Sequence, residues 1–143
     1  MVSGPVFIDT WGWLALGHRK DPRHDEAAEY YRTLRSEGER VYTSDYVLDE
    51  VITLIFRRES FDEATRFVNG IIAAARMGYI SVERITPERL AAAWDLRVRL
   101  KDKARISFTD LTSMIVMREC KVKHVLTEDR HFTQVGLGFQ LVP

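Results

Sequence analysis

Short apolar runs alternate with longer amphipathic segments along the chain. Residues 6–8 form an unbroken apolar run that ends at Asp9, as expected of a buried strand. Further strands are predicted at 41–43, 79–82, 124–126 and 139–142. Helices are predicted at 11–16, 25–37, 44–58, 60 to about 78, 86 to about 101 and 107 to about 119, with a turn at 127–132.

Local signals mark where several of these helices begin. Ser60-Phe61-Asp62-Glu63 is a capping box, in which the serine accepts from the backbone of the first turn. Thr86-Pro87 places a cap residue directly before a proline at the first helical position. Ser44 and Ser107 precede two further helices in the same manner.

The alternation of strands and helices predicts the fold class. Parallel strands require crossover connections, and helices of this length supply them. We therefore expect an α/β/α sandwich with a mostly parallel central sheet, formed by one domain over residues 1–143. In such sheets ligands bind beyond the carboxyl ends of the strands.

Composition is that of an ordinary globular protein, with 143 residues, 45% hydrophobic and 29% charged. Cys120 is the single cysteine, which excludes a disulfide framework and favours a reducing cytoplasm. No apolar run reaches the roughly 20 residues of a membrane span, and residues 1–5 lack the pattern of a signal peptide.

The net charge is zero, but its distribution is uneven. Residues 1–72 carry 9 basic and 13 acidic side chains, and residues 73–143 carry 12 and 8. Residues 97–105 alone hold five basic side chains and one acid. This segment could bind nucleic-acid phosphates, or could simply be a solvated helix end favoured by the helix dipole.

Four acidic residues fall where an active site is expected. Asp9 and Asp129 follow two of the strands, and Asp110 lies in the first turn of a helix. Glu50 borders the apolar stripe of its helix, where an unpaired carboxylate is unusual. Taken singly, Asp9, Asp110 and Asp129 could each serve a helix end, and Glu50 could be solvated.

If the four acids converge, their mutual repulsion must be relieved. Two unit charges about 4 Å apart repel by about 4 kcal/mol at an effective dielectric of about 20. A cluster of four must take up protons, pair with cations or bind a metal ion. Oxygen ligands suit Mg²⁺ or Mn²⁺, either of which can activate water against a phosphodiester.

Four segments in order resemble the PIN-domain ribonucleases, most closely the VapC-type toxins of toxin–antitoxin pairs. The segments are Val6-Phe7-Ile8-Asp9-Thr10, residues 43–51, Ser107-Phe108-Thr109-Asp110, and residues 126–132. The resemblance covers essentially the whole chain. It implies a Mg²⁺- or Mn²⁺-dependent endoribonuclease that uses water to leave a 5′-phosphate and a 3′-hydroxyl.

The resemblance also implies roles for individual residues. Asp9 and Asp110 would be the principal metal ligands, with Glu50 and Asp129 completing the site directly or through water. The hydroxyl groups of Thr10 and Thr127 would orient carboxylates, water or phosphate. Asp49 and Glu128 adjoin two of these acids, and the family spacing favours Glu50 and Asp129 over them. Implied partners are an RNA substrate, an antitoxin protein and a second copy of the chain.

Two alternatives within the same fold stay open: a PIN module that binds RNA or protein without catalysis, and a PIN nuclease outside any toxin pair. Other phosphate chemistry fits poorly. A receiver-type phosphoacceptor would need a second acid beside Asp9, and a HAD-type phosphatase would need an Asp-x-Asp motif, whereas Thr10-Trp11 follows.

Two further features call for assignment. His131 lies two residues after Asp129 and could touch substrate, but we expect a surface or packing role for it. A zinc site is not expected, because no paired metal-ligand spacing occurs. Trp11 and Trp13, two residues apart, cannot both face one side of a helix, so one of them is available to a partner.

Overall fold

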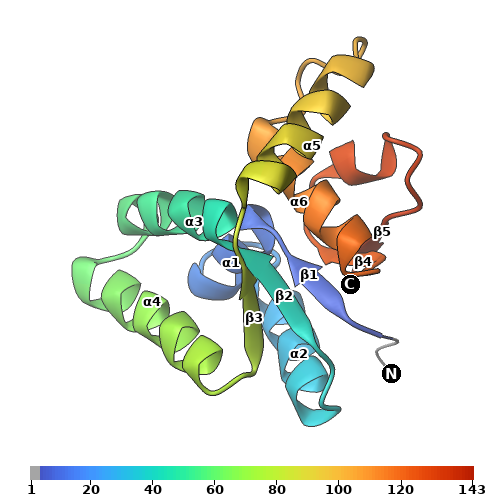
Figure 1. Cartoon of the computed structure of the whole chain (residues 1–143). Coiled ribbons are helices and arrows are strands. Elements are labelled where there is room, and N and C mark those ends of the chain that lie inside the picture. Colours follow the sequence, from blue (N-terminus) through green and yellow to red (C-terminus); the bar gives the residue numbers. More distant parts are fainter. Residues whose placement is uncertain (1–3) are drawn as a thin grey trace.

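Five strands form one parallel sheet in the order β3-β2-β1-β4-β5 (Figure 1). The structure is a computed structural model and describes residues 4–143. The four pairings among these residues are all parallel. The strands are β1 (Val6–Ile8), β2 (Val41–Ser44), β3 (Ile80–Glu83), β4 (His124–Leu126) and β5 (Gln140–Val142).

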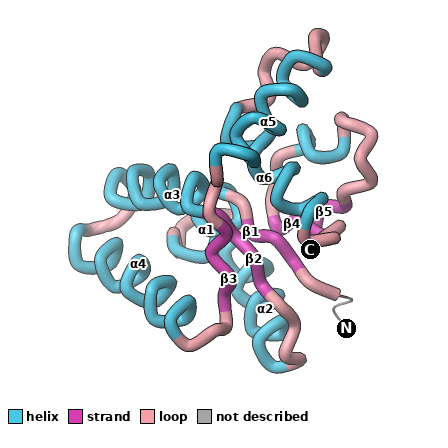
Figure 2. Tube along the Cα trace, viewed as in Figure 1, coloured by secondary structure: helices cyan, strands magenta, loops and turns pink. Residues whose placement is uncertain are grey.

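Helices connect the strands, and the alternation of the two is visible along the chain (Figure 2). Two helices lie between β1 and β2, two between β2 and β3, and two between β3 and β4, while a single 3₁₀ turn precedes β5. They are α1 (Thr10–Gly17), α2 (His24–Ser36), α3 (Asp45–Arg58), α4 (Phe61–Arg76), α5 (Pro87–Arg99), α6 (Phe108–Glu119) and η1 (Arg130–Thr133).

The predicted α/β/α class and its parallel sheet are confirmed. All three residues of β1 are buried, as a strand covered on both faces must be. The helix starts also follow the predicted caps. Four side-chain oxygens each accept from the backbone N–H three residues later, those of Ser44, Ser60, Thr86 and Ser107.

Small differences from the predicted boundaries have local causes. Strand β3 begins at Ile80, because the backbone N–H of Tyr79 still donates to the Ala74 oxygen of α4 at 2.9 Å. The predicted turn at 127–132 overlaps η1, which extends to Thr133 and whose His131 N–H donates to the Asp129 carboxylate.

The two tryptophans of α1 lie in different surroundings, as the helical period requires. Trp13 is buried against Tyr31 and Phe67, and its indole N–H donates to the Thr43 hydroxyl at 3.0 Å. Trp11 is 43% exposed, with the guanidinium of Arg58 over its ring. Helix α1 therefore anchors one aromatic ring in the core and presents the other at the surface.

Helix α1 packs closely against the end of β4 because residue 12 is glycine. A β-carbon built on Gly12 would lie 2.3 Å from the backbone oxygen of Leu126. Only glycine allows the first turn of α1 to approach the strand to this distance. The close contact brings the residue before α1, Asp9, beside the residues that follow β4.

The order of the strands places a switch point between β1 and β4. From β1 the chain continues to β2 and then β3, and afterwards crosses back to β4 on the other side of β1. The carboxyl ends of β1 and β4 therefore flank the crevice in which ligands of open parallel sheets bind. Asp9 and Thr127 directly follow these two strands.

Helices α5 and α6 pack side by side, and α5 extends away from the sheet (Figure 1). The loop at residues 100–107 joins their outer ends and leads into the first turn of α6. Within residues 4–143, no helix has both the length and the apolar character needed to cross a membrane.

Candidate active site

Four elements bring the predicted acids to the carboxyl edge of the sheet. Asp9 follows β1, and Glu50 lies on α3. Asp110 lies in the first turn of α6, and Asp129 caps η1 just after β4. Asp110 is within electrostatic reach of the other three carboxylates. We call these four side chains, Asp9, Glu50, Asp110 and Asp129, the acidic cluster.

Asp9 is both a helix cap and a member of the cluster. Its side chain is 1% exposed, and Oδ1 accepts from the Gly12 N–H at 2.9 Å. Oδ2 accepts from the Thr127 hydroxyl at 2.6 Å. Burial nonetheless raises the pKa of Asp9 from 3.8 to about 7, with a further contribution from the charge of Asp129. Two good hydrogen bonds therefore do not compensate the carboxylate for the loss of water.

Thr127 joins two of the acids through its hydroxyl group. Besides donating to Asp9, Oγ1 accepts from the backbone N–H of Asp129 at 2.9 Å. The side chain is 4% exposed, which limits competition from water for either bond. Asp9 and the turn that carries Asp129 are thus held in fixed relation by one side chain.

Thr10 forms a similar link to α3. Its hydroxyl donates to Oε1 of Glu50 at 2.7 Å, so Glu50 is tied to the first residue of α1. The neighbouring acid Asp49 is exposed. Asp45 accepts from the Tyr46 and Ile85 N–H groups, at 2.9 Å and 3.0 Å. Of the three acids on α3, Glu50 is the one bonded to a residue next to Asp9.

The pKa of Asp110 is raised further than that of Asp9. Burial, followed by the charges of Asp9, Asp129 and Glu50, raises the pKa of Asp110 from 3.8 to about 8. Its position in the first turn of α6 favours a negative charge, but by only about 0.3–1 kcal/mol. Repulsion and burial therefore dominate, and the cluster holds protons at neutral pH unless a cation is bound.

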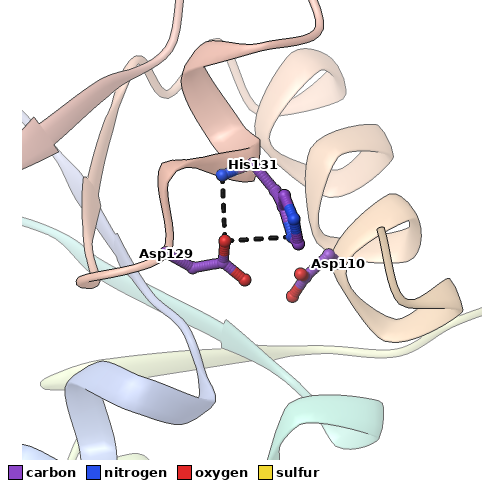
Figure 3. Close-up of side chains that lie close together, drawn as sticks. All are labelled: Asp110, Asp129 and His131. Atoms are coloured by element: carbon purple, nitrogen blue, oxygen red, sulfur yellow. Dashed lines mark hydrogen bonds and ion pairs between the residues drawn. The ribbon is translucent and has the colours of Figure 1, made fainter. Parts of the chain in front are cut away.

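His131 lies beside two acids of the cluster, a position that a surface or packing role does not require. The potential ligand atoms of Asp110, Asp129 and His131 all lie within 4.8 Å of one another. The three side chains face a common space between η1 and α6 (Figure 3). The sequence signal was its spacing, two residues beyond Asp129 in a turn that returns the ring toward α6.

The donor set fits a divalent metal ion. Carboxylate oxygens predominate, as Mg²⁺ and Mn²⁺ prefer, and one imidazole is adjacent. A bound cation would favour the charged forms of Asp9 and Asp110, whose pKa values are raised by burial and by neighbouring acids. Asp110, Asp129 and His131 have ligand atoms close enough to share one ion, and Asp9 borders them through Thr127 and Asp129.

The basic side chains of residues 97–105 differ in what they contact. The Arg97 guanidinium donates to three backbone oxygens of the loop, those of Leu100, Lys103 and Ile106, at 2.7–3.0 Å. Arg97 therefore stabilises the loop, and its hydrogen bonds to the loop leave it less able to bind a ligand. Lys101 and Arg105 are exposed on the same loop.

Comparison with known proteins assigns the family. Residues 6–137 match the family model of the PIN domain, a span that contains the whole acidic cluster. The chain belongs to the PIN-domain family. It is 35% identical over 132 residues to the 23S rRNA-specific endonuclease VapC20 of Mycobacterium tuberculosis, covering 92% of this chain and 94% of that protein.

Several solved structures share the fold. The crystal structure of M. tuberculosis VapC20, described as a sarcin-ricin-loop-cleaving toxin, superposes with a TM-score of 0.75 at 32% identity. That match covers 92% of this chain and 95% of VapC20. VapBC2 from Rickettsia felis, bound to promoter DNA, gives a TM-score of 0.72 at 14% identity, covering 96% of this chain and 97% of its own. PAE2754 from Pyrobaculum aerophilum gives a TM-score of 0.63 at 14% identity, and the match covers 97% of this chain and 90% of PAE2754.

Proposed function

We propose that this PIN-domain protein is a metal-dependent endoribonuclease and the toxin of a toxin–antitoxin pair. The observation that carries the proposal is the convergence of Asp9, Glu50, Asp110 and Asp129 at the switch point of the sheet. The 35% identity to VapC20 supports a ribosomal RNA as substrate and, with it, action in the cytoplasm.

The cofactor is proposed to be Mg²⁺ or Mn²⁺, with Asp9 and Asp110 as principal ligands. Glu50 and Asp129 complete the site, directly or through water. When bound, such an ion lowers the pKa of a water molecule and stabilises negative charge on the phosphate. The protein residues supply position: Thr10 holds Glu50, and Thr127 holds Asp9 against the Asp129 turn. Fixed carboxylates of this kind reduce the reorganisation needed during reaction.

The RNA backbone is proposed to follow the loop at residues 100–107. This loop enters α6 directly before Asp110, so phosphates bound to it would lie beside the acidic cluster. Lys101 and Arg105 are its exposed cations, while Lys103 pairs with Asp102 at 3.1 Å. Phosphate contacts of this kind orient RNA without reading its sequence. Selectivity for one RNA site therefore has to come from shape and from bases that reach the site.

The antitoxin is proposed to bind a groove of about 510 Å³ between α1, α2 and α4. Trp13, Tyr31 and Phe67 form an aromatic part of its lining, and exposed arginines stand among the other lining residues. This combination suits an amphipathic segment with apolar anchors and acidic flanks. The arginines are Arg19, Arg32, Arg35 and Arg66. A homodimer is proposed as the working state, by the family resemblance.

The test is cleavage of 23S rRNA fragments by the purified chain with Mg²⁺, Mn²⁺ or EDTA. We expect metal-dependent cuts with 5′-phosphate ends, absent from an Asp9→Asn preparation made identically. Cleavage that persists in EDTA, or equally in Asp9→Asn, would contradict the proposal. Asp49→Asn is the matched control and should cut like the wild type, because Asp49 is exposed on α3.

A further inference from the structure

A metal site formed by the acidic cluster alone does not explain the position of His131. Its Nδ1 atom is buried from solvent and has no hydrogen-bond partner of acceptable geometry among the described residues. That nitrogen lies 3.0 Å from Oδ1 of Asp129, close enough for an ion pair. The ring is 32% exposed overall, so solvent reaches one side of it while Nδ1 faces the acids.

A role confined to orienting Asp129 does not account for this placement. Oδ1 of Asp129 already accepts from the backbone N–H of His131 at 2.9 Å, and Thr127 fixes the Asp129 backbone. The carboxylate is therefore held without the imidazole. A packing role would not place a buried polar nitrogen 3.0 Å from a carboxylate oxygen without a well-formed hydrogen bond, because an unsatisfied buried polar atom costs about 1–3 kcal/mol.

The distances suit a shared ion instead. Two ligand atoms on opposite sides of an ion at 2.0–2.1 Å are about 4.2 Å apart, and adjacent ligands are closer. The ligand atoms of Asp110, Asp129 and His131 lie within 4.8 Å of one another. Movement of a few tenths of an ångström, within the range of side-chain adjustment, would bring all three to one ion. Figure 3 shows the side chains of Asp110, Asp129 and His131 pointing toward one another.

We propose that His131 is a nitrogen ligand of the metal bound by Asp110 and Asp129, and that it biases the site toward Mn²⁺ over Mg²⁺. This inference rests on the proposed function, since it concerns the ion of the same site. Mg²⁺ demands oxygen ligands and releases its water reluctantly, whereas later divalent metals accept imidazole more readily. One nitrogen among oxygen donors therefore favours Mn²⁺, and Co²⁺ more strongly still.

The experiment is metal binding to the purified, metal-free chain, with no RNA present. Calorimetric titrations give the affinities for Mn²⁺ and Mg²⁺ in wild type, His131→Gln and His124→Gln. Glutamine has comparable reach and offers an amide oxygen, so the variant exchanges a nitrogen donor for an oxygen donor. His124 begins β4, at the opposite end of that strand from the site, and is the matched control. Pulsed electron paramagnetic resonance of the Mn²⁺ form detects a nitrogen bonded to the ion.

We expect His131→Gln to weaken Mn²⁺ binding about 10-fold while Mg²⁺ affinity changes less than about twofold, within the range known for altered metal surroundings. The nitrogen signal should be present in wild type and His124→Gln and absent from His131→Gln. No nitrogen signal in the wild type would overturn the inference. An equal loss of affinity for both ions would do so as well, because it would make His131 a positioning residue for Asp129.

Metal titration of Asp110→Asn distinguishes failure of this inference from failure of the proposed function. If wild type binds metal and Asp110→Asn does not, the metal site stands whatever His131 does. If wild type and Asp110→Asn bind neither ion, or bind equally well, the acidic cluster is not the metal site and both proposals fall.

Discussion

Replacing Asp110 by Asn should stabilise the metal-free protein at pH 8 and leave it nearly unchanged at pH 4. The pKa of Asp110 is raised from 3.8 to about 8 by burial and by the charges of Asp9, Asp129 and Glu50. Between these values the folded protein retains a proton that the unfolded chain releases. The unfolded state binds fewer protons, so the free energy of unfolding falls as the pH rises through this window.

The size of the effect follows from the shift. About four pKa units, at 1.36 kcal/mol each, set an upper limit of about 5 kcal/mol at pH 8. Asp110 is only partly buried, and solvent screening lowers this, so we expect a gain of about 2 kcal/mol and a Tm rise of about 4–8 °C. The lost attraction to the start of α6, about 0.3–1 kcal/mol, is too small to reverse the sign.

The assay is urea or thermal unfolding in EDTA at pH 4, 6 and 8. Asp49→Asn removes an exposed acid from α3 and should match the wild type at every pH. Saturating Mn²⁺ should stabilise the wild type by about 2.7 kcal/mol at 100 times Kd, with little effect on Asp110→Asn. If Asp110→Asn is no more stable than wild type at pH 8, or gains equally at pH 4, repulsion within the acidic cluster is not the cause.

Three further changes test separate parts of the account. Thr43→Val removes the hydroxyl that accepts from the buried indole N–H of Trp13. The unpaired N–H should lower the free energy of unfolding by about 1–3 kcal/mol, measured in urea. Thr127→Val cuts the link between two acids and should weaken Mn²⁺ binding about 10–100-fold, with Thr127→Ser restoring most of it. Reversing Lys101 and Arg105 to Glu in a cleavage-dead background should weaken RNA binding and reduce its salt slope by about 0.7 per lost phosphate contact. Lys123→Glu, before β4, should leave the slope unchanged, and an equal effect there would remove the loop from the RNA path.

Much of the fold was predictable because its signals are local. The helices after Ser44, Ser60, Thr86 and Ser107 begin where a short polar side chain can accept from the first turn. The apolar run of β1 is buried on both faces, which is what an α/β/α sandwich requires. The tryptophans of α1 diverged for the same reason, since residues two apart face different directions on a helix.

The parts of the site that were predictable are those that follow from the order of strands and helices along the chain. Parallel strands align their carboxyl ends, so Asp9 and Asp129 were expected near each other, and Glu50 was favoured by its place beside an apolar stripe. Their catalytic roles stay predictions. The side of η1 on which His131 emerges depends on the tertiary course of that turn, which no local pattern specifies.

The basic segment shows the same limit. In the sequence, residues 97–105 present equivalent positive charges. In the structure, Arg97 is bound by three loop carbonyls, while Lys101 and Arg105 face solvent. Backbone oxygens left without partners at a helix end attract the nearest guanidinium, and which one reaches them depends on how the loop turns.

The most direct test of the central claim, that the acidic cluster binds divalent metal, is a crystal structure of the protein soaked in Mn²⁺ with anomalous scattering data. We expect an anomalous peak about 2–2.3 Å from carboxylate oxygens of Asp9 and Asp110, the proposed principal ligands, and none in Asp110→Asn crystals treated identically. A peak bound elsewhere, or an empty acidic cluster at a Mn²⁺ concentration that supports full RNA cleavage, would contradict it.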